Sequence, residues 1–265
     1  MCGALNGDRC GDDEASCGAL LAEAHAQDVE IDYFARDDHA QVLHVTHDTK
    51  HALVTTISAS AYARTILDDL DIRASDILQS NGIIWVEGPS DRIYVNKWIE
   101  LLSDGALREG AHYQVLFYGG KLLAHLTASE DTNAIKILTT NRHVALLMDS
   151  DQSGPDDSIN ATKQRLRSEV TAAGGYAWFT SGREIENELP TNLLTSTTGL
   201  TTTPGRYDDV PEALKKDPNV RAKFTDKVTL AMTIAPLLRL EHVTGDLAAR
   251  VQQLLDDIRR WNSSS

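Results

Sequence analysis

Short, continuous apolar runs alternate with helix-like stretches through the middle of the chain. Ile83–Val86 and Val144–Met148 contain only apolar residues, which is typical of strands buried on both faces of a parallel sheet. Strands joined to helices by short glycine-containing links indicate an α/β fold. The same patterns predict two more strands and two helices, at residues 113–117, 176–179, 90–102 and 158–173. Because right-handed crossovers bring the carboxyl ends of parallel strands to one edge, we expect a ligand site at that edge.

The flanking segments differ from this α/β domain, which we place at residues 79–195. Residues 1–28 are rich in Gly, Ala and Asp and are interpreted as a loose leader. The next segment, 29–78, predicts antiparallel strands followed by a helix, so that a small β-rich segment precedes the sheet. The last segment, 196–265, predicts a loop and a C-terminal helical region. The individual strands and helices expected in these two segments lie at 29–34, 41–45, 51–55, 58–70, 223–240 and 246–261.

Charge and hydropathy narrow the classes of function. The 39 Asp and Glu residues outnumber the 25 Lys and Arg residues, for a net charge of −14. This balance argues against broad, nonspecific phosphate binding by a basic face, but it leaves room for nucleic acid held through metal ions at one site. The apolar runs are too short to span a membrane, and no signal peptide is visible at the start. We therefore expect a cytoplasmic protein with no membrane partner.

Acidic residues follow the predicted strands. Glu87 comes directly after Val86, and Asp149 comes directly after Met148. Asp91, in the first turn of the next helix, can face the same point as Glu87. The edge is therefore expected to collect six acids, namely Glu87, Asp91, Asp149, Asp151, Glu184 and Glu186.

Converging carboxylates repel one another unless a cation neutralises them. Mg²⁺ prefers oxygen ligands and keeps waters that substrate phosphates can displace, so the pattern indicates a magnesium site acting on phosphoesters. Each acid also has a simpler interpretation. An acid after a strand is often the cap or first-turn acid of the next helix. Glu184, Glu186 and Glu188 alternate, and they could form a solvated strip.

Three segments resemble a known family in combination. Residues 83–92, Ile-Ile-Trp-Val-Glu-Gly-Pro-Ser-Asp-Arg, resemble the first motif of Toprim domains, and residues 146–151, Leu-Leu-Met-Asp-Ser-Asp, resemble the second. Residues 183–187, Arg-Glu-Ile-Glu-Asn, with Leu189 and Pro190 after them, resemble the C-terminal half of the OLD (overcoming lysogenization defect) family of ATP-dependent endonucleases. The resemblance covers roughly residues 58 to 240, and it implies a Toprim, Rossmann-like sheet over 79–195.

The resemblance also implies roles for single residues. Glu87, Asp91, Asp149 and Asp151 would bind metal, and Glu87 would also take part in proton transfer. Glu184 or Glu186 would complete a second metal position, and the motif leaves the choice open. The family's lysine in the region after the Toprim strands matches Lys227 first and Lys223 second, with an ordinary surface lysine as the alternative. The glycines that would bring the backbone close to the site or to phosphate are Gly88, Gly119 and Gly120, although a plain strand-to-helix turn explains Gly119 and Gly120 equally well.

The implied function is a divalent-metal-dependent DNA endonuclease that uses two Mg²⁺ or Mn²⁺ ions. The sequence departs from the family in one respect, because it contains no Gly-x4-Gly-Lys-Ser/Thr phosphate loop. Residues 29–78 could resemble only the end of the family's ATPase domain, so a separate ATPase subunit is an expected partner besides DNA, and a homodimer is an open possibility. The alternatives are a non-catalytic or truncated OLD fragment that acts as a partner subunit, and a Toprim enzyme that acts on RNA.

Overall fold

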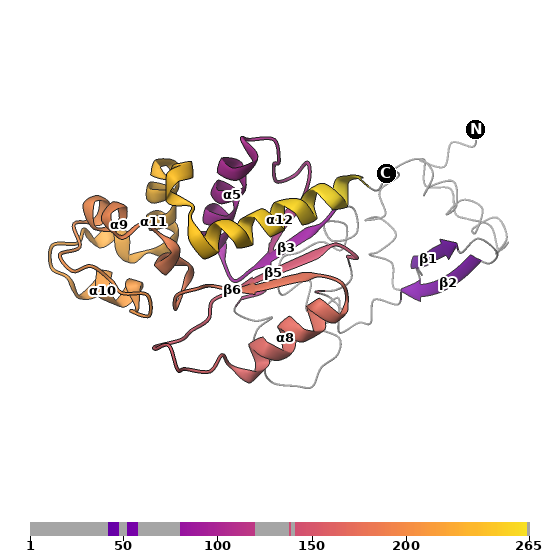
Figure 1. Cartoon of the computed structure of the whole chain (residues 1–265), viewed down its shortest axis with the longest axis horizontal. Helices are drawn as coiled ribbons and strands as arrows, with labels where there is room; N and C mark the ends of the chain where they lie inside the picture. Colours follow the sequence, from indigo (N-terminus) through magenta and orange to yellow (C-terminus); the bar gives the residue numbers. More distant parts are fainter. Residues whose placement is uncertain (1–41, 48–51, 58–79, 120–137, 139–140, 264–265) are drawn as a thin grey trace, which may run out of the picture. The chain divides into compact units, whose positions relative to one another are not determined.

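The computed structural model of the chain describes residues 42–47, 52–57, 80–119, 138 and 141–263 (Figure 1). Contacts divide the chain into two units, residues 1–60 with 73–75, and residues 61–72 with 76–265. In the first unit, β1 (Val42–His47) and β2 (Ala52–Ile57) pair in antiparallel fashion. This pairing confirms two of the predicted N-terminal strands. The leader, the strand predicted at 29–34 and the helix predicted at 58–70 lie outside the described residues.

The second unit is built on a four-stranded parallel sheet. Its strands are β3 (Ile83–Val86), β4 (Gln114–Phe117), β5 (Val144–Met148) and β6 (Tyr176–Phe179). The strand order is β4-β3-β5-β6, and each neighbouring pair is parallel. The predicted α/β fold with a parallel sheet flanked by helices is therefore confirmed. The strand order also places the two all-apolar strands, β3 and β5, side by side in the centre.

Helices lie on both faces of this sheet. α5 (Pro89–Ser103) and α12 (Gly245–Ser263) pack on one face and α8 (Ala161–Ala172) on the other (Figure 1). Pro89 starts α5 at the position where its missing N–H is not needed. Asn160 caps α8 by accepting a hydrogen bond from the Thr162 amide at 2.8 Å. The predicted helices at 90–102 and 158–173 are thus found with shifted ends.

The C-terminal region contains more elements than the sequence predicts. Helix α9 (Thr191–Thr198) extends into residues 195–209, which were expected to form a loop, and α10 (Val210–Lys216) is a helix that was not predicted. The single helix predicted at 223–240 is wrong, because the segment divides into η2 (Ala222–Thr225), α11 (Lys227–Ile234) and η3 (Ala235–Leu237). Pro236 cannot continue an α-helix, and Asp226 caps a new start by accepting from the Thr229 amide at 2.8 Å. Two shorter turns, η1 (Ile185–Glu188) and η4 (Leu240–His242), complete the region.

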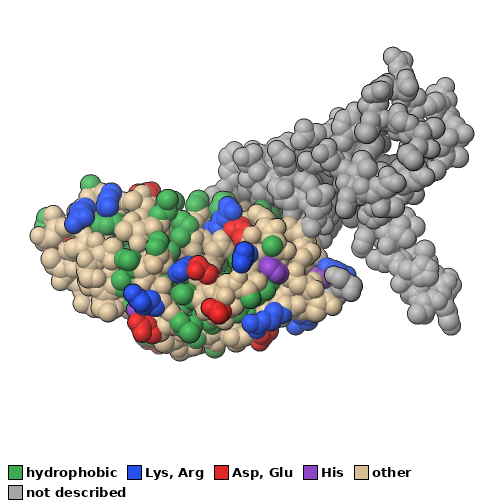
Figure 2. Space-filling model, turned by 90° about the horizontal axis from the view of Figure 1, so that it is seen from above, with side chains coloured by type: hydrophobic (Ala, Val, Ile, Leu, Met, Phe, Trp, Pro, Cys, Tyr) green, Lys and Arg blue, Asp and Glu red, His purple; other side chains and the backbone are tan. Residues whose placement is uncertain are grey.

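The surface of the described part carries charges of both signs. On the face drawn in Figure 2, Lys and Arg side chains are interspersed with Asp and Glu side chains. This face therefore presents no broad basic area of the kind that binds phosphate nonspecifically. None of the described helices is long and apolar enough to cross a membrane.

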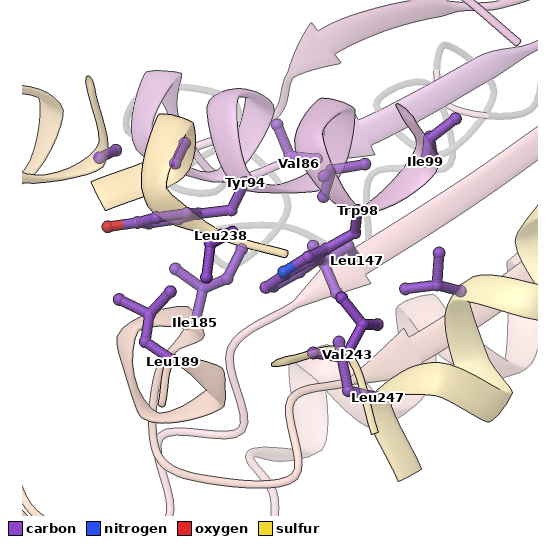
Figure 3. Close-up of a cluster of buried hydrophobic side chains, with 14 of the residues drawn as sticks. Val86, Tyr94, Trp98, Ile99, Leu147, Ile185, Leu189, Leu238, Val243 and Leu247 are labelled. Carbon is purple, nitrogen blue, oxygen red and sulfur yellow. The ribbon is translucent and has the colours of Figure 1, made fainter. Parts of the chain in front are cut away.

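The sheet divides the core into two buried clusters, because successive strand residues point to opposite faces. Ile83 and Trp85 belong to the cluster under α8, whereas Ile84 and Val86 belong to the cluster under α5 and α12. Figure 3 shows part of the second cluster, where Trp98 of α5 lies against Leu147 of β5.

Candidate metal and phosphate site

Glu87 and Asp149 directly follow β3 and β5, the two central strands of the sheet. The charge of Asp91 acts on both carboxylates, and the charge of Glu87 acts on Asp149. The largest charge effect on Glu87 comes from Lys163 of α8, and the largest on Asp149 comes from Asp91 of α5.

Asp91 combines two functions that the sequence left as alternatives. Its Oδ2 accepts a hydrogen bond from the Gly88 amide at 2.9 Å, and its Oδ1 accepts one from the Ser90 hydroxyl at 3.2 Å. The first of these bonds satisfies the free amide of the N-cap residue Gly88 at the start of α5. Asp91 is also buried beside the other acids, and burial raises its pKa despite the hydrogen bonds. The helix-cap role is therefore observed, and it places this carboxylate inside the acidic cluster.

The segment Asp149–Asp151 is held in a fixed conformation by its neighbours. The Ser150 amide donates to Thr180 Oγ1 at 2.9 Å, and the Ser150 hydroxyl donates to the Gly182 carbonyl at 2.6 Å. The Asp151 amide donates to the Arg183 carbonyl at 2.9 Å. These bonds hold Asp151 at φ 56°, a left-handed conformation that is uncommon outside glycine. Such sparsely populated backbone conformations are often found at functional sites.

Lys163 is a site residue that the sequence analysis missed. It lies in the first turn of α8 and is buried, and its Nζ donates to the Asp149 carbonyl at 2.7 Å and to the Asp151 carboxylate. A signal was present in the sequence. A lysine in the first turn of a helix opposes the helix dipole, so it needs a compensating partner nearby.

Lys227 pairs with both glutamates that were left open as alternatives. Its Nζ lies 2.6 Å from Glu184 Oε2 and 3.3 Å from Glu186 Oε2. Lys223, the second choice, instead lies over the ring of Phe224 at 4.7 Å. Burial alone would lower the pKa of Lys227, but the charges of Glu186 and Glu184 raise it above its ordinary value. Lys227 is therefore held in its charged form next to the acidic cluster.

Glu186 is the most deeply buried acid of the set. Its side chain is 0% exposed, and its Oε1 has no hydrogen-bond partner among the described residues. Burial raises the pKa of Glu186 to about 7, although Lys227 partly opposes the rise. A buried carboxylate oxygen without a partner is costly, and a cation or a proton would remove that cost.

The remaining acids destabilise one another's charged forms. Burial raises the pKa of Asp149 well above its ordinary value, and the charges of Asp91 and Glu87 raise it further. Burial also raises the pKa of Glu87, which Lys163 partly lowers. The hydroxyl of Tyr118, at the end of β4, is buried in the same region and has no hydrogen-bond partner among the described residues. Tyr118 was also missed, because nothing in its sequence context separates it from a core tyrosine.

The three glycines expected near the site have different surroundings. The Gly119 amide donates to the Glu87 carbonyl at 3.1 Å, and a Cβ at Gly119 would lie 2.2 Å from that oxygen. A Cβ at Gly88 would meet nothing within 4 Å, so Gly88 leaves open space beside the cap of α5. Gly120 lies outside the described residues.

The donor chemistry of the cluster fits a hard divalent cation. All the acids offer oxygen, the mutual charge repulsion calls for a cation, and Glu186 Oε1 lacks a partner. Within the part of the chain that the structure describes, however, no three Asp, Glu, His or Cys residues are grouped so that they could hold a metal ion. Binding an ion here therefore requires the carboxylates to move closer together than they lie in this structure.

Comparisons with known proteins identify similar structures but no similar sequence family. No family model matches the chain, and no curated protein matches it. The chain is similar to the C-terminal region of the Burkholderia pseudomallei OLD protein, with 16% identity and a TM-score of 0.40, over 68% of this chain and 98% of that one. It is also similar to the C-terminal region of the Xanthomonas campestris pv. campestris OLD protein, with 16% identity and a TM-score of 0.38, over 70% of this chain and 95% of that one.

Both solved structures come from the family whose motifs the sequence resembles. At these TM-scores the likeness gives no information about a site or an activity. The functional proposal therefore depends on the contacts of this chain's own residues.

Proposed function

We propose that this chain is a divalent-metal-dependent endonuclease that cleaves phosphodiester bonds in DNA, of the Toprim type found in OLD proteins. The observation that carries the proposal is the convergence of Glu87, Asp91 and Asp149, where burial raises each carboxyl pKa and neighbouring acids raise those of Glu87 and Asp149 further. These acids come from two strand ends and one helix start, so the fold itself assembles them. A hard cation is the group that relieves such repulsion and that phosphate oxygens also bind.

Glu87, Asp91 and Asp149 are the residues that would hold the ion. A bound Mg²⁺ or Mn²⁺ would supply Lewis acidity and lower the pKa of a water ligand. The residues of this chain would do the remaining work. Glu87, half-buried at the edge of the sheet, would accept a proton from the attacking water. Lys227, kept charged by Glu184 and Glu186, would offset the negative charge that develops on the phosphate.

The proposed function includes three binding partners, namely DNA, a separate ATPase subunit and a second copy of the chain. DNA follows from the motif resemblance, and the ATPase follows from the family's dependence on ATP. The acidic balance of the chain, −14 overall, favours substrate held at the metal site over substrate held by a wide basic surface.

The proposal is tested by nicking of supercoiled plasmid in Mg²⁺ or Mn²⁺, with single-stranded RNA as a second substrate. Glu87→Gln and Asp149→Asn should each lower the nicking rate by about 10²-fold or more, since each removes a charge at the reacting centre. Asp256→Asn is the matched control, because Asp256 lies on the exposed side of α12, where it pairs with Arg259 at 3.0 Å and accepts a hydrogen bond from Gln252 at 2.9 Å. Unchanged nicking in both site variants would overturn the proposal. Cleavage of RNA alone would keep the metal chemistry and change the substrate, and an inert protein that binds no Mn²⁺ would support the non-catalytic alternative.

A further inference from the structure

Lys163 is more deeply buried than the acid with which it pairs. Its side chain is 7% exposed, whereas that of Asp151 is 58% exposed. The ammonium therefore reaches the carboxylate from inside the protein. Its second acceptor is the Asp149 carbonyl at 2.7 Å, so both ends of the Asp-x-Asp segment meet at one positive charge.

The free-energy cost of a buried lysine at the start of a helix has to be offset by nearby partners. A positive charge in the first turn of a helix is disfavoured by the helix dipole, and burying an ammonium removes most of its hydration. Both costs fall on Lys163 at the start of α8. The oxygens of Asp149 and Asp151 provide the compensation, in the way that they would provide it for a metal ion.

The left-handed conformation of Asp151 also supports the view that Lys163 takes the place of a metal ion here. The bonds of Ser150 to Thr180 and Gly182 hold the backbone of the segment, and the Asp151 carboxylate accepts a hydrogen bond from Lys163. Lys227 likewise pairs with Oε2 of both Glu184 and Glu186. The acids expected to complete a second metal position thus already have lysine partners, whereas Glu87 and Asp149 have no ion-paired lysine on their carboxylates among the described residues.

We propose that Lys163 is a built-in cation of this site and that the chain binds one divalent ion, held by the Glu87, Asp91 and Asp149 carboxylates, in place of the two expected from the sequence. The inference rests on the proposed metal site, and it specifies how that site is charged. The Lys163 ammonium supplies the second positive charge at the Asp151 side of the edge. Replacing it with a neutral side chain leaves Asp151 and the Asp149 carbonyl free to take up another ion.

The number of ions per chain tests the inference without any assay of activity. Mn²⁺ titrations of the full chain, followed by calorimetry and by electron paramagnetic resonance of free Mn²⁺, give the stoichiometry directly. The wild type should bind one ion. Lys163→Ala and Lys163→Gln should each bind two, the second more weakly, and Lys163→Arg should bind one because the positive charge is retained. Lys216→Ala is the matched control, since Lys216 is 75% exposed and pairs with Glu212 on α10.

The outcomes separate the inference from the proposed function. Two ions bound by the wild type would overturn the inference and leave the metal-dependent nuclease standing. One ion bound by the wild type and by folded Lys163→Ala and Lys163→Gln would also overturn it. No ion bound by the wild type would overturn the metal site itself. Circular dichroism and thermal melting establish whether the variants fold. If both neutral variants fail to fold, the number of ions bound by the wild type still decides whether the inference holds.

Discussion

The backbone of Gly119 lies directly against that of Glu87, with the Gly119 amide 3.1 Å from the Glu87 carbonyl oxygen. A Cβ on residue 119 would lie 2.2 Å from that oxygen and 3.0 Å from Glu87 Cγ. The close approach therefore depends on glycine, and it joins the ends of β3 and β4 at the point where the site begins.

Gly119→Ala should displace Glu87, because the new methyl group overlaps backbone that cannot rotate away. We expect the free energy of unfolding to fall by about 1–3 kcal/mol and Mn²⁺ affinity to fall with it. Urea denaturation and Mn²⁺ calorimetry measure the two effects. Gly154→Ala is the control, since a Cβ there meets nothing within 4 Å, and its stability should stay within about 0.5 kcal/mol of wild type. Unchanged metal affinity in Gly119→Ala would contradict the assigned contact.

The stability of the metal-free protein should decrease as pH rises from about 4.5 to about 7. Burial raises the pKa of Glu186 from its ordinary value of 4.5 to about 7, so the folded state binds more protons than the unfolded state in this window. The stabilisation is therefore complete below the unfolded pKa and is lost as pH rises through the folded pKa, by at most about 3 kcal/mol for this one group.

Urea denaturation in EDTA at pH 5, 6 and 7 measures this decrease. The comparison variant is Glu186→Gln, which does not titrate and should show a flatter dependence on pH. Equal slopes for the two proteins would show that Glu186 is not the group responsible. Added Mg²⁺ should raise the stability of the wild type most at pH 7, where the carboxylates are charged.

Lys227→Met should destabilise the protein by about 1–3 kcal/mol, because the buried Glu186 carboxylate loses the ammonium at 3.3 Å. The double variant Lys227→Met with Glu186→Gln should be more stable than Lys227→Met alone, since an uncharged amide needs no cation. A double-mutant cycle by urea denaturation measures the coupling. Additive effects of the two changes would mean that Lys227 acts at this site only through Glu184.

Trp261→Ala should cost about 3–5 kcal/mol, as expected for removing a large buried side chain. Trp261 fixes the end of α12 against the start of β3, where a Cβ on Gly82 would lie 2.1 Å from its ring. Its ring also stacks on His143 at a centroid distance of 6.0 Å. Thermal and urea unfolding measure the loss. Met232→Ala is the control, because Met232 is 65% exposed, and an equal loss in both variants would contradict the proposed packing.

Local patterns were sufficient to predict the sheet. Ile83–Val86 and Val144–Met148 are apolar throughout because both faces of their strands are covered, and this property is visible in the sequence itself. The helices beside them could also be predicted, because capping residues and the spacing of apolar residues are visible in the sequence. The region after residue 190 was harder, since α9 has a Thr-rich composition that is poor in helix signals and folds as a helix through burial of Leu194 and Thr198.

The sequence by itself determined which acids follow the strands, and therefore which carboxylates share one edge of the sheet. Only the tertiary structure decided which positively charged groups lie next to these carboxylates. Lys163 and Lys227 lie 12 and 41 residues from Asp151 and Glu186 along the chain, and only the packing of α8 and α11 brings their ammonium groups onto these acids. Electrostatic energy depends on distance in space and on burial, and neither can be read from separation along the chain.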